Sequence, residues 1–366
     1  MSNSKIPAVE VQGLTKSFGS VLALDGVDVS IGEGEYFVLL GPSGGGKTTL
    51  LRVIGGFIRP NAGKVLLHGH DVSALPPDKR PTTMVFQSYA LFPHMSVARN
   101  VGYGLRIKRL ASKDIAERVD AMLELVGLAG YGARMPHELS GGQQQRVQLA
   151  RSLVLDRDIL LLDEPLAALD ANLRKDMCLE LKRLQETVGI TFVHVTHNQE
   201  EAMTVADRIA IIADGKLIEA GTARDVYERP VKRFTADFVG ENNVLGGTLV
   251  AVDKSKVTID LGFGRIDVPV GDTVATEGVP ASFSIRSELM ELLPADGKLT
   301  NSTQTLNGTY REAVYLGIFI SHVVTLPDGT AVIVRKISGG TENRRFERGE
   351  AVKIGWEMTA ARLHMS

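Results

Sequence analysis

The sequence predicts an α/β domain built on a mostly parallel sheet, followed by a separate all-β domain. The first prediction rests on continuous apolar runs such as Tyr36 to Leu40 and Ile159 to Leu162, because strands buried on both faces have this composition. It also rests on amphipathic helical stretches between such runs, which connect parallel strands. The second prediction rests on short alternating strands that recur after Val244. We therefore expect a first domain over residues 1–240 and an all-β barrel domain over residues 241–366.

Length and composition agree with two globular domains. The chain has 366 residues, 44% of them hydrophobic, and its formal net charge of -2 provides no overall basic field that would attract nucleic acid. Its single cysteine, Cys178, cannot form an internal disulfide and fits a reducing compartment. Residues Met1 to Lys5 lead into a polar stretch without the apolar core of a signal peptide. The longest apolar runs fall short of the ~20 residues that span a bilayer, so we expect peripheral membrane association at most.

The chain opens with an expected antiparallel strand pair. Val9 to Leu14 and Leu22 to Ile31 alternate apolar and polar residues, as half-exposed strands do. Phe18 lies between them. Its ring can stack on a nucleobase or cover the end of a hydrophobic core, and the residues alone leave both interpretations open.

A glycine-rich loop follows the first buried run. Its letters, Gly-Pro-Ser-Gly-Gly-Gly-Lys-Thr, match the phosphate-binding pattern Gly-x4-Gly-Lys-[Ser/Thr] between a strand and a helix. Lys47 can place a positive charge on the β- and γ-phosphates, and Thr48 can give a hydroxyl ligand to Mg²⁺. A turn that only connects strand and helix is the alternative. The predicted contacts to a nucleoside triphosphate are Gly41, Pro42, Ser43, Gly44, Gly45, Gly46, Lys47, Thr48 and Thr49.

Two short strands, Lys64 to Leu67 and Thr83 to Phe86, come next, and Gln87 directly follows the second. An amide at the carboxyl end of a buried strand can ligate Mg²⁺, orient a water or simply bond the strand end. The stretch from Ser88 to His94 is unusually apolar for a loop. It is either a docking surface or a buried core segment.

A helical subdomain is expected over about residues 88–155. Ser96 to Lys108 and Ser112 to Val126 have helical periodicity, and each begins with a serine that can cap a helix. A further helix is expected from Gln144 to Leu155. Its first turn is a second candidate anion site, because N–H groups and the helix dipole point at a ligand there. The predicted contacts of this site are Ser140, Gly141, Gly142 and Gln143.

Paired carboxylates end the second buried run. Adjacent acids at a buried strand end are costly unless they meet a cation or a substrate proton. Asp163 can reach the magnesium shell that it would share with Thr48, and Glu164 can act as the general base toward an attacking water. The alternative is a cap for the next helix, which Pro165 and the loop to Asp170 disfavour.

A long amphipathic helix, Ala171 to Val188, and a β-branched strand, Thr191 to Val195, precede His197. A lone histidine is usually structural. This one is expected at the same strand edge as Gln87 and Asp163, where ligands collect in open α/β sheets. The remaining expected elements of the first domain are a helix over Gln199 to Ala206 and a hairpin of Arg208 to Ile212 with Lys216 to Glu219.

In the second domain, eight strands are predicted between Thr248 and Trp356. They contain no catalytic triad, metal-ligand cluster or glycine-rich cradle. A structural or dimerising module is the favoured interpretation.

Six motifs in this order resemble the ATPase subunits of ABC transporters. The matching segments are Gly41 to Thr48 (Walker A), Gln87 (Q-loop), Leu139 to Gln143 (signature), Ile159 to Glu164 (Walker B), Ala168 to Asp170 (D-loop) and His197 (H-loop). Phe18 resembles the base-stacking aromatic of the family. The resemblance covers residues 8–238, and the β domain is similar to the C-terminal OB-like (TOBE) domains of importer ATPases. Val85 to Ser96 is most similar to polyamine importer ATPases.

The resemblance implies two copies paired head to tail, with each ATP and its Mg²⁺ between one P-loop and the other copy's Ser140 and Gly142. It implies that Glu164, His197, Gln87 and Lys47 carry catalysis, that Thr48, Gln87 and Asp163 hold the metal, and that Asp170 contacts the nucleotide. It also implies membrane permease subunits as partners, a periplasmic solute-binding protein indirectly, no nucleic acid, and a place on the cytoplasmic face of the bacterial inner membrane.

For the solute, the resemblance favours a polyamine over ferric iron, an aminophosphonate or a sugar. More remote alternatives are a soluble family member acting on DNA or the ribosome, an exporter subunit, and a phosphotransferase that uses only the P-loop. The second anion site speaks against the phosphotransferase, because it would have no role there.

Overall fold

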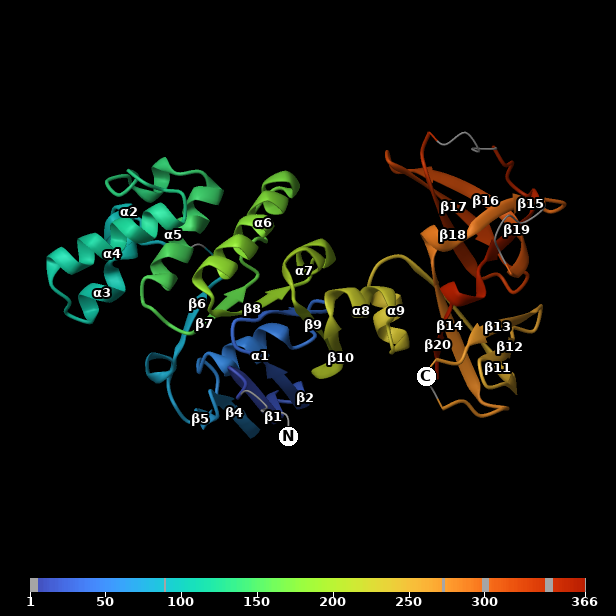
Figure 1. Cartoon of the computed structure of the whole chain (residues 1–366), viewed down its shortest axis with the longest axis horizontal. Helices are drawn as coiled ribbons and strands as arrows, with labels where there is room; N and C mark the ends of the chain where they lie inside the picture. Colours follow the sequence, from blue (N-terminus) through green and yellow to red (C-terminus); the bar gives the residue numbers. More distant parts are fainter. Residues whose placement is uncertain (1–5, 89, 272–273, 298–302, 340–344, 366) are drawn as a thin grey trace. The chain divides into compact units, whose positions relative to one another are not determined.

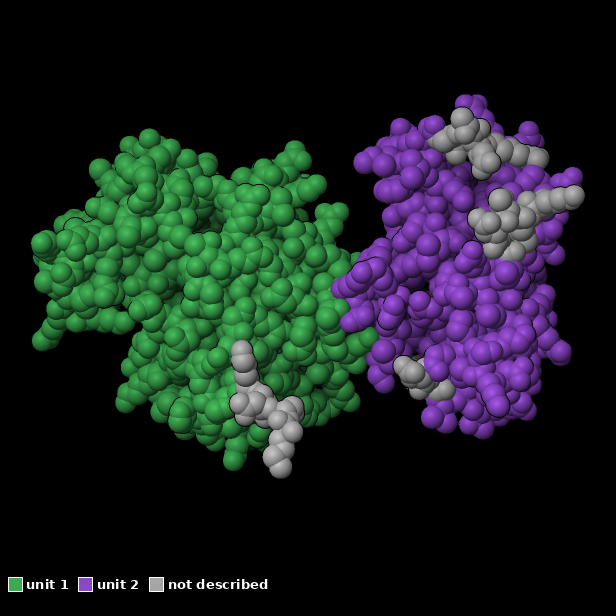
Figure 2. Space-filling view, in the orientation of Figure 1, with its two compact units in different colours: residues 1–223 green, residues 224–366 purple. Residues whose placement is uncertain are grey.

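The computed structural model describes residues 6–88, 90–271, 274–297, 303–339 and 345–365. Contacts divide the chain into two compact units, residues 1–223 and residues 224–366 (Figure 2). Each unit has a hydrophobic core of its own. No helix within the described ranges is long and apolar enough to cross a bilayer.

Unit 1 contains a parallel sheet with one antiparallel edge strand (Figure 1). The strand order is β10-β9-β3-β8-β7-β6, and all neighbours are parallel except β10 and β9. Its central strands are buried on both faces, as their apolar runs predicted. The strands are β3 (Tyr36–Leu40), β6 (Thr82–Val85), β7 (Ile159–Asp163), β8 (Thr191–Thr196), β9 (Arg208–Ala213) and β10 (Lys216–Thr222).

A four-stranded antiparallel sheet, ordered β2-β1-β4-β5, shares the core of the parallel sheet. Helix α1 (Lys47–Ile54) contributes Leu50, Leu51, Val53 and Ile54 to that core. The strands are β1 (Val9–Phe18), β2 (Val21–Ile31), β4 (Ala62–Leu67) and β5 (His70–Asp71). The helices α6 (Ala171–Val188) and α7 (Gln199–Val205) complete this part of the unit.

The helices α2 to α5 lie together at one side of unit 1 around a separate apolar cluster (Figure 1). The helix expected from Ser96 to Lys108 is split at Gly102. A Cβ there would lie 3.0 Å from Ile115, so the glycine allows α4 to approach closely. Ser96 caps α2 as expected, but Ser112 lies inside α4 and Ala111 precedes it. The helices are α2 (Val97–Val101), α3 (Tyr103–Ile107), α4 (Ser112–Leu125) and α5 (Gly141–Leu153).

Unit 2 is dominated by two five-stranded antiparallel sheets, ordered β13-β12-β11-β14-β20 and β15-β19-β16-β17-β18. Their shared core contains Phe283 and Trp356. The prediction of an all-β domain is confirmed, and the short strands β15 and β20 were not predicted. The strands are β11 (Asn242–Val252), β12 (Lys256–Asp260), β13 (Arg265–Pro269), β14 (Pro280–Arg286), β15 (Glu291–Pro294), β16 (Gln304–Tyr315), β17 (Phe319–Thr325), β18 (Ala331–Ile337), β19 (Ala351–Trp356) and β20 (Arg362–His364).

Two short helices, α8 (Ala223–Glu228) and α9 (Arg233–Phe238), precede these sheets. Helix α9 packs against β11 and β14. The buried Arg286 guanidinium of β14 donates to the carbonyls of Tyr227 and Val239. Contacts therefore divide the chain near residue 223, whereas we expected the first domain to continue to residue 240.

Candidate nucleotide site

Four parallel strands end at the same edge of the six-stranded sheet, and each is followed by a candidate site residue. The glycine-rich loop follows β3, Gln87 follows β6, Glu164 follows β7 and His197 follows β8. Ligands bind at the carboxyl edge of open α/β sheets because the following loops diverge there. The sheet topology thus gathers motifs that lie far apart in the sequence.

The loop from Gly41 to Thr48 wraps closely against neighbouring backbone. Gly46 has a left-handed φ of 104°, and a Cβ there would lie 2.5 Å from the Ala23 carbonyl oxygen. A side chain would therefore push the loop out of place. The Lys47 ammonium donates to the carbonyls of Gly41 at 2.8 Å and Pro42 at 2.7 Å. Burial lowers the pKa of Lys47, and the nearby Glu164 carboxylate opposes that shift.

Helix α1 directs two side chains onto Asp163. The Thr48 hydroxyl donates to Asp163 Oδ1 at 3.1 Å, and Arg52 Nη2 lies 3.3 Å from Asp163 Oδ2. Thr48 and Asp163 thus meet as the sequence predicted. Arg52 was missed, although its spacing of one helical turn after Thr48 places it on the same face of the helix. Hydroxyl and carboxylate oxygens side by side are donors that suit Mg²⁺.

Glu164 is the point where three strand ends meet. Gln87 Nε2 donates to Glu164 Oε2 at 3.3 Å, and His197 Nδ1 lies 3.3 Å from Glu164 Oε1. The backbone φ of Glu164 is 46°, in the left-handed region that residues other than glycine rarely adopt. Its N–H donates to the Val195 carbonyl on β8 at 3.0 Å, which holds this conformation.

Buried Glu201 fixes the residues on both sides of His197 through hydrogen bonds. Thr196, the residue before His197, donates its hydroxyl to Glu201 Oε2 at 2.6 Å. Asn198, the residue after it, donates its N–H to the same hydroxyl oxygen at 3.0 Å and caps α7 by accepting from the Glu201 N–H. Burial raises the pKa of Glu201. Sequence reasoning missed Glu201, since a glutamate inside a short helix carries no local signal of a buried role.

The second predicted anion site lies at the start of α5. Ser140 caps this helix by accepting from the Gln143 N–H at 3.4 Å, and Gln143 Oε1 accepts from the Ser140 N–H at 3.0 Å. Gly142 is buried, whereas Ser140 is exposed. In the described parts of the chain, no hydrogen bond connects the segment 140–143 with the loop from Gly41 to Thr48.

Asp170 caps α6, because its carboxylate accepts from the Leu173 N–H at 3.0 Å. The alternative in which Asp163 or Glu164 caps this helix is therefore wrong. Phe18 ends β1 and is 48% exposed, and the centre of its ring lies 5.0 Å from Lys16 Nζ. Thr49 is partly buried on α1.

The loop from Ser88 to His94 is packed in part against the helical cluster, and the docking surface stays a prediction. Leu91 packs against the helical cluster, and the Phe92 ring lies 4.6 Å from that of Tyr103. Ser88, Ala90 and His94 are exposed. Tyr89 lies outside the described residues.

Comparisons with known proteins agree with this geometry. A family model described as "ABC transporter" matches residues 24–167, and one described as "TOBE domain" matches residues 283–363. Among solved structures, the chain is similar to the dimeric ATP-binding cassette MJ0796 in a post-hydrolysis state bound to ADP and Pi. The identity is 32%, the TM-score 0.53, and the match covers 59% of this chain and 99% of that one. It is also similar to cbiO1 from Clostridium perfringens, with 29% identity and a TM-score of 0.57 over 60% of this chain and 90% of that one.

Curated relatives match over nearly the whole length. The spermidine/putrescine import ATP-binding protein PotA of Mesorhizobium japonicum is 46% identical over 95% of this chain and 94% of the relative. Proteins of the same name from Thermobifida fusca and Pseudomonas aeruginosa are each 43% identical, and the alignments cover 97% and 98% of this chain and 93% and 98% of the relatives. The chain belongs to the import ATP-binding proteins of the ABC transporter family, which bind and hydrolyse ATP, and it carries their C-terminal TOBE domain.

Proposed function

We propose that this chain is the ATPase subunit of a polyamine importer, taking spermidine or putrescine. The substrate class is supported by the names of several relatives that share 42–46% of their residues with this chain. The observation that carries the ATPase mechanism is the convergence on Glu164: the Gln87 amide and the His197 imidazole each lie 3.3 Å from its carboxylate. This cluster is adjacent to the Thr48–Asp163 contact through the shared strand end of β7.

In the proposed mechanism, the triphosphate lies along the N–H groups of Gly41 to Thr48, and the Lys47 ammonium turns from its loop carbonyls to the β- and γ-phosphates. Phe18 stacks on the base, and Thr49 lines the phosphate site. Glu164 accepts a proton from the attacking water as general base. His197 holds the water and the γ-phosphate in position, and the Gln87 amide orients the water from the other side.

Mg²⁺ is the metal that these residues suit. Thr48, Asp163 and Gln87 offer a hydroxyl, a carboxylate and an amide oxygen, and Mg²⁺ prefers a few oxygen ligands together with substrate phosphates. When bound, it would neutralise charge on the phosphates. Arg52 places a positive charge 3.3 Å from Asp163 Oδ2 and so orients that carboxylate.

The exposed Ser140 at the N-terminus of α5 favours a site completed by a second copy, because its N–H groups would meet the γ-phosphate of the partner's ATP. Gly141, Gly142, Gln143 and Asp170 would belong to the same shared site. A dimeric neighbour bound to ADP and Pi supports this arrangement. The proposed assembly is two copies on a pair of membrane permease subunits, at the cytoplasmic face of the inner membrane, with solute delivered by a periplasmic binding protein.

The test is Glu164→Gln, which keeps the shape of the side chain but removes the base. We expect ATP binding to stay within about threefold, ATP turnover to fall by about 10²-fold or more, and an ATP-bound dimer to persist in size-exclusion chromatography. In cells that rely on this chain, uptake of labelled spermidine should be lost with the variant. Glu186→Gln, an exposed change on α6, is the matched control and should leave turnover and uptake unchanged.

Full turnover in Glu164→Gln would overturn the assignment of the base. Uptake of ferric iron, an aminophosphonate or a sugar that requires the wild-type chain, without uptake of spermidine or putrescine, would overturn the polyamine assignment and leave the ATPase mechanism intact.

A further inference from the structure

The backbone around Gln87 is held by side chains of α5, the helix that Ser140 caps. Gln148 is 1% exposed, and its Nε2 donates to the carbonyls of Phe86 at 2.9 Å and Ser88 at 3.2 Å. The two hydrogens of one amide thus bond the carbonyls of the residues before and after Gln87.

Arg151 continues the same attachment one turn further along α5. Its Nη1 donates to the Ala90 carbonyl at 2.7 Å, and its guanidinium lies 5.5 Å from the centre of the Phe92 ring. Burial lowers the pKa of Arg151. Gln148 and Arg151 therefore bond the carbonyls of alternate residues, Phe86, Ser88 and Ala90, and we call these two side chains the α5 clamp.

The side chain of Gln87 points the other way, to Glu164. Gln87 therefore links two elements: the carbonyls of its two neighbours are bonded to α5, and its side-chain amide is bonded to the Glu164 carboxylate after β7. A displacement of α5 relative to the sheet would move the Gln87 amide relative to Glu164.

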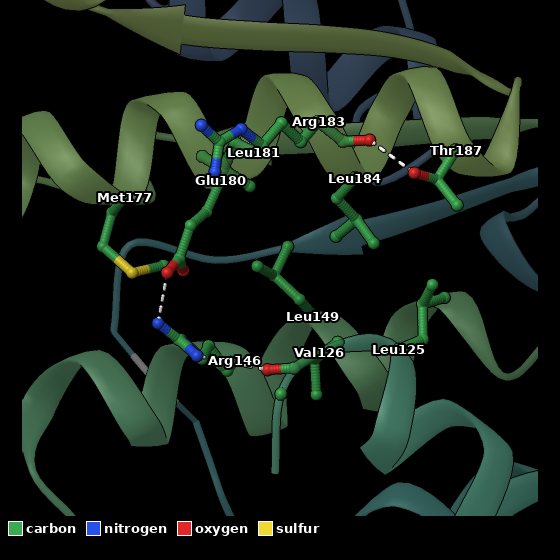
Figure 3. A pocket seen from close by; sticks show the side chains of 11 residues that line it. Leu125, Val126, Arg146, Leu149, Met177, Glu180, Leu181, Arg183, Leu184 and Thr187 are labelled. Carbon is green, nitrogen blue, oxygen red and sulfur yellow. Dashed lines mark hydrogen bonds and ion pairs between the residues drawn. The ribbon is translucent and has the colours of Figure 1, made fainter.

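The opposite side of α5 leaves room for such a displacement. A cavity of about 250 Å³ lies between α5 and α6 and is lined largely by apolar side chains, among them Leu149 and Leu184 (Figure 3). The Arg146–Glu180 ion pair bridges the two helices at one end of it (Figure 3). Packing between α5 and α6 is thus incomplete, whereas three hydrogen bonds join α5 to the backbone on either side of Gln87.

We propose that Gln148 is a positioning residue for catalysis: through the backbone of Phe86 and Ser88 it sets the place of the Gln87 amide at Glu164. This inference rests on the proposed role of Gln87 and adds the residue that controls it. Because Ser140 caps the same helix, contact of Ser140 with a partner's ATP would be transmitted through the α5 clamp to Gln87 in the chain's own site.

The test uses the full-length chain and Gln148→Met, which keeps the length and volume of the side chain but removes both N–H donors. Two unpaired carbonyls loosen the loop. We expect kcat for ATP hydrolysis to fall about tenfold, with KM for ATP unchanged within about twofold, because Gln148 is buried and is not among the proposed nucleotide contacts. Gln148→Ala, which leaves space for a bridging water, should lose less activity and provides a second variant.

The matched control is Gln185→Met. Gln185 is 3% exposed, and its Nε2 also donates to two carbonyls, those of Gly34 at 2.7 Å and Ile190 at 3.3 Å. It lies at the end of α6, away from Gln87. This variant should lower the melting temperature comparably and leave kcat unchanged within about twofold.

A double-mutant cycle with Gln87→Ala decides whether Gln148 acts through Gln87. If it does, Gln148→Met should change kcat less than about twofold in the Gln87→Ala background. A full tenfold loss in that background, or no loss in Gln148→Met alone, would overturn the inference.

Hydrogen exchange gives a readout independent of catalysis. The peptide that contains Phe86 to Phe92 should exchange faster in Gln148→Met than in wild type and in Gln185→Met. Unchanged exchange of this peptide in Gln148→Met would also contradict the proposal that Gln148 holds the loop. Wild-type activity in Gln87→Ala would instead reject the proposed role of Gln87, and the exchange result would still decide whether Gln148 holds the loop.

Discussion

Buried His194 on β8 makes the stability of unit 1 depend on pH. Its side chain is 0% exposed, and burial lowers its pKa from 6.5 to about 3. Tyr36 shares a hydrogen bond with its Nδ1 at 3.1 Å, and Glu201 lies 3.8 Å from its Nε2. Because the ring is neutral near pH 7, this approach to Glu201 is not an ion pair.

In the unfolded chain His194 takes up a proton below pH 6.5, while in the folded chain it stays neutral to about pH 3. The unfolded state therefore binds more protons in this window, and stability falls as the pH falls, by up to about 1.4 kcal/mol per pH unit from this residue. Glu201 contributes in the opposite direction. Because burial raises its pKa, its contribution to stability falls as the pH rises above the usual pKa of a glutamate.

His194→Gln should remove the histidine contribution. We expect the variant to lose about 1 kcal/mol less per pH unit than wild type between pH 6 and pH 4, measured by urea unfolding. His70→Gln, on the exposed strand β5, is the control. If the free energy of unfolding fell equally with pH in His194→Gln and in wild type, His194 would not be the source of the pH dependence.

At the scale of elements, the end of α1 depends on a side chain from outside the helix. Arg80 is 1% exposed, and its Nη1 donates to the carbonyls of Val53 and Ile54, each at 2.8 Å. Its Nε donates to the Leu75 carbonyl at 3.0 Å. A guanidinium at the C-terminus of a helix satisfies its last carbonyls and favours the negative end of the helix dipole.

Arg80→Met should therefore destabilise the chain by about 3 kcal/mol, since buried carbonyls lose a charged donor. Chemical unfolding measures this change. Arg80→Lys should recover part of the loss, because an ammonium cannot reproduce the fork of the guanidinium. Lys79→Ala, an exposed change at the neighbouring residue, should alter the free energy of unfolding by less than about 0.5 kcal/mol. If Lys79→Ala and Arg80→Met destabilised the chain equally, the loss could not be assigned to the bonds between Arg80 and the end of α1.

At the scale of the whole molecule, the contacts of α8 and α9 determine where the chain can be divided. Ala236 and Val239 are 0% exposed, and Arg286 bonds the carbonyls of Tyr227 and Val239. A fragment of residues 224–366 keeps these contacts, whereas a fragment of residues 241–366 loses them.

We expect the 224–366 fragment to unfold cooperatively and the 241–366 fragment to melt at a lower temperature by about 4 °C or more, since a loss of about 1 kcal/mol shifts a domain of this size by a few degrees. Circular dichroism melts of the two fragments provide the comparison. Identical melts would mean that α8 and α9 contribute nothing to the second unit.

The family resemblance drawn from the order of six motifs is confirmed by the comparisons. Buried strands were predicted well because their apolar runs are local, as at Ile159 to Leu162. Helix boundaries were less predictable: the break at Gly102 depends on the approach of Ile115 and Val119 from α4. Arg80 and Glu201 were missed because each acts on a partner that no nearby sequence pattern reveals, whereas Arg52 was missed although it shares a helix face with Thr48.

The sequence by itself determined the phosphate-binding loop, the paired carboxylates and the two-domain plan, because these are patterns of adjacent residues with one backbone requirement each. Only the tertiary structure decided that Gln87 and His197 both meet Glu164, and that Gln148 bonds the backbone beside Gln87. The physical reason is distance along the chain: such contacts exist only after strand order and helix packing bring the segments together, and many other contacts would satisfy the same local patterns.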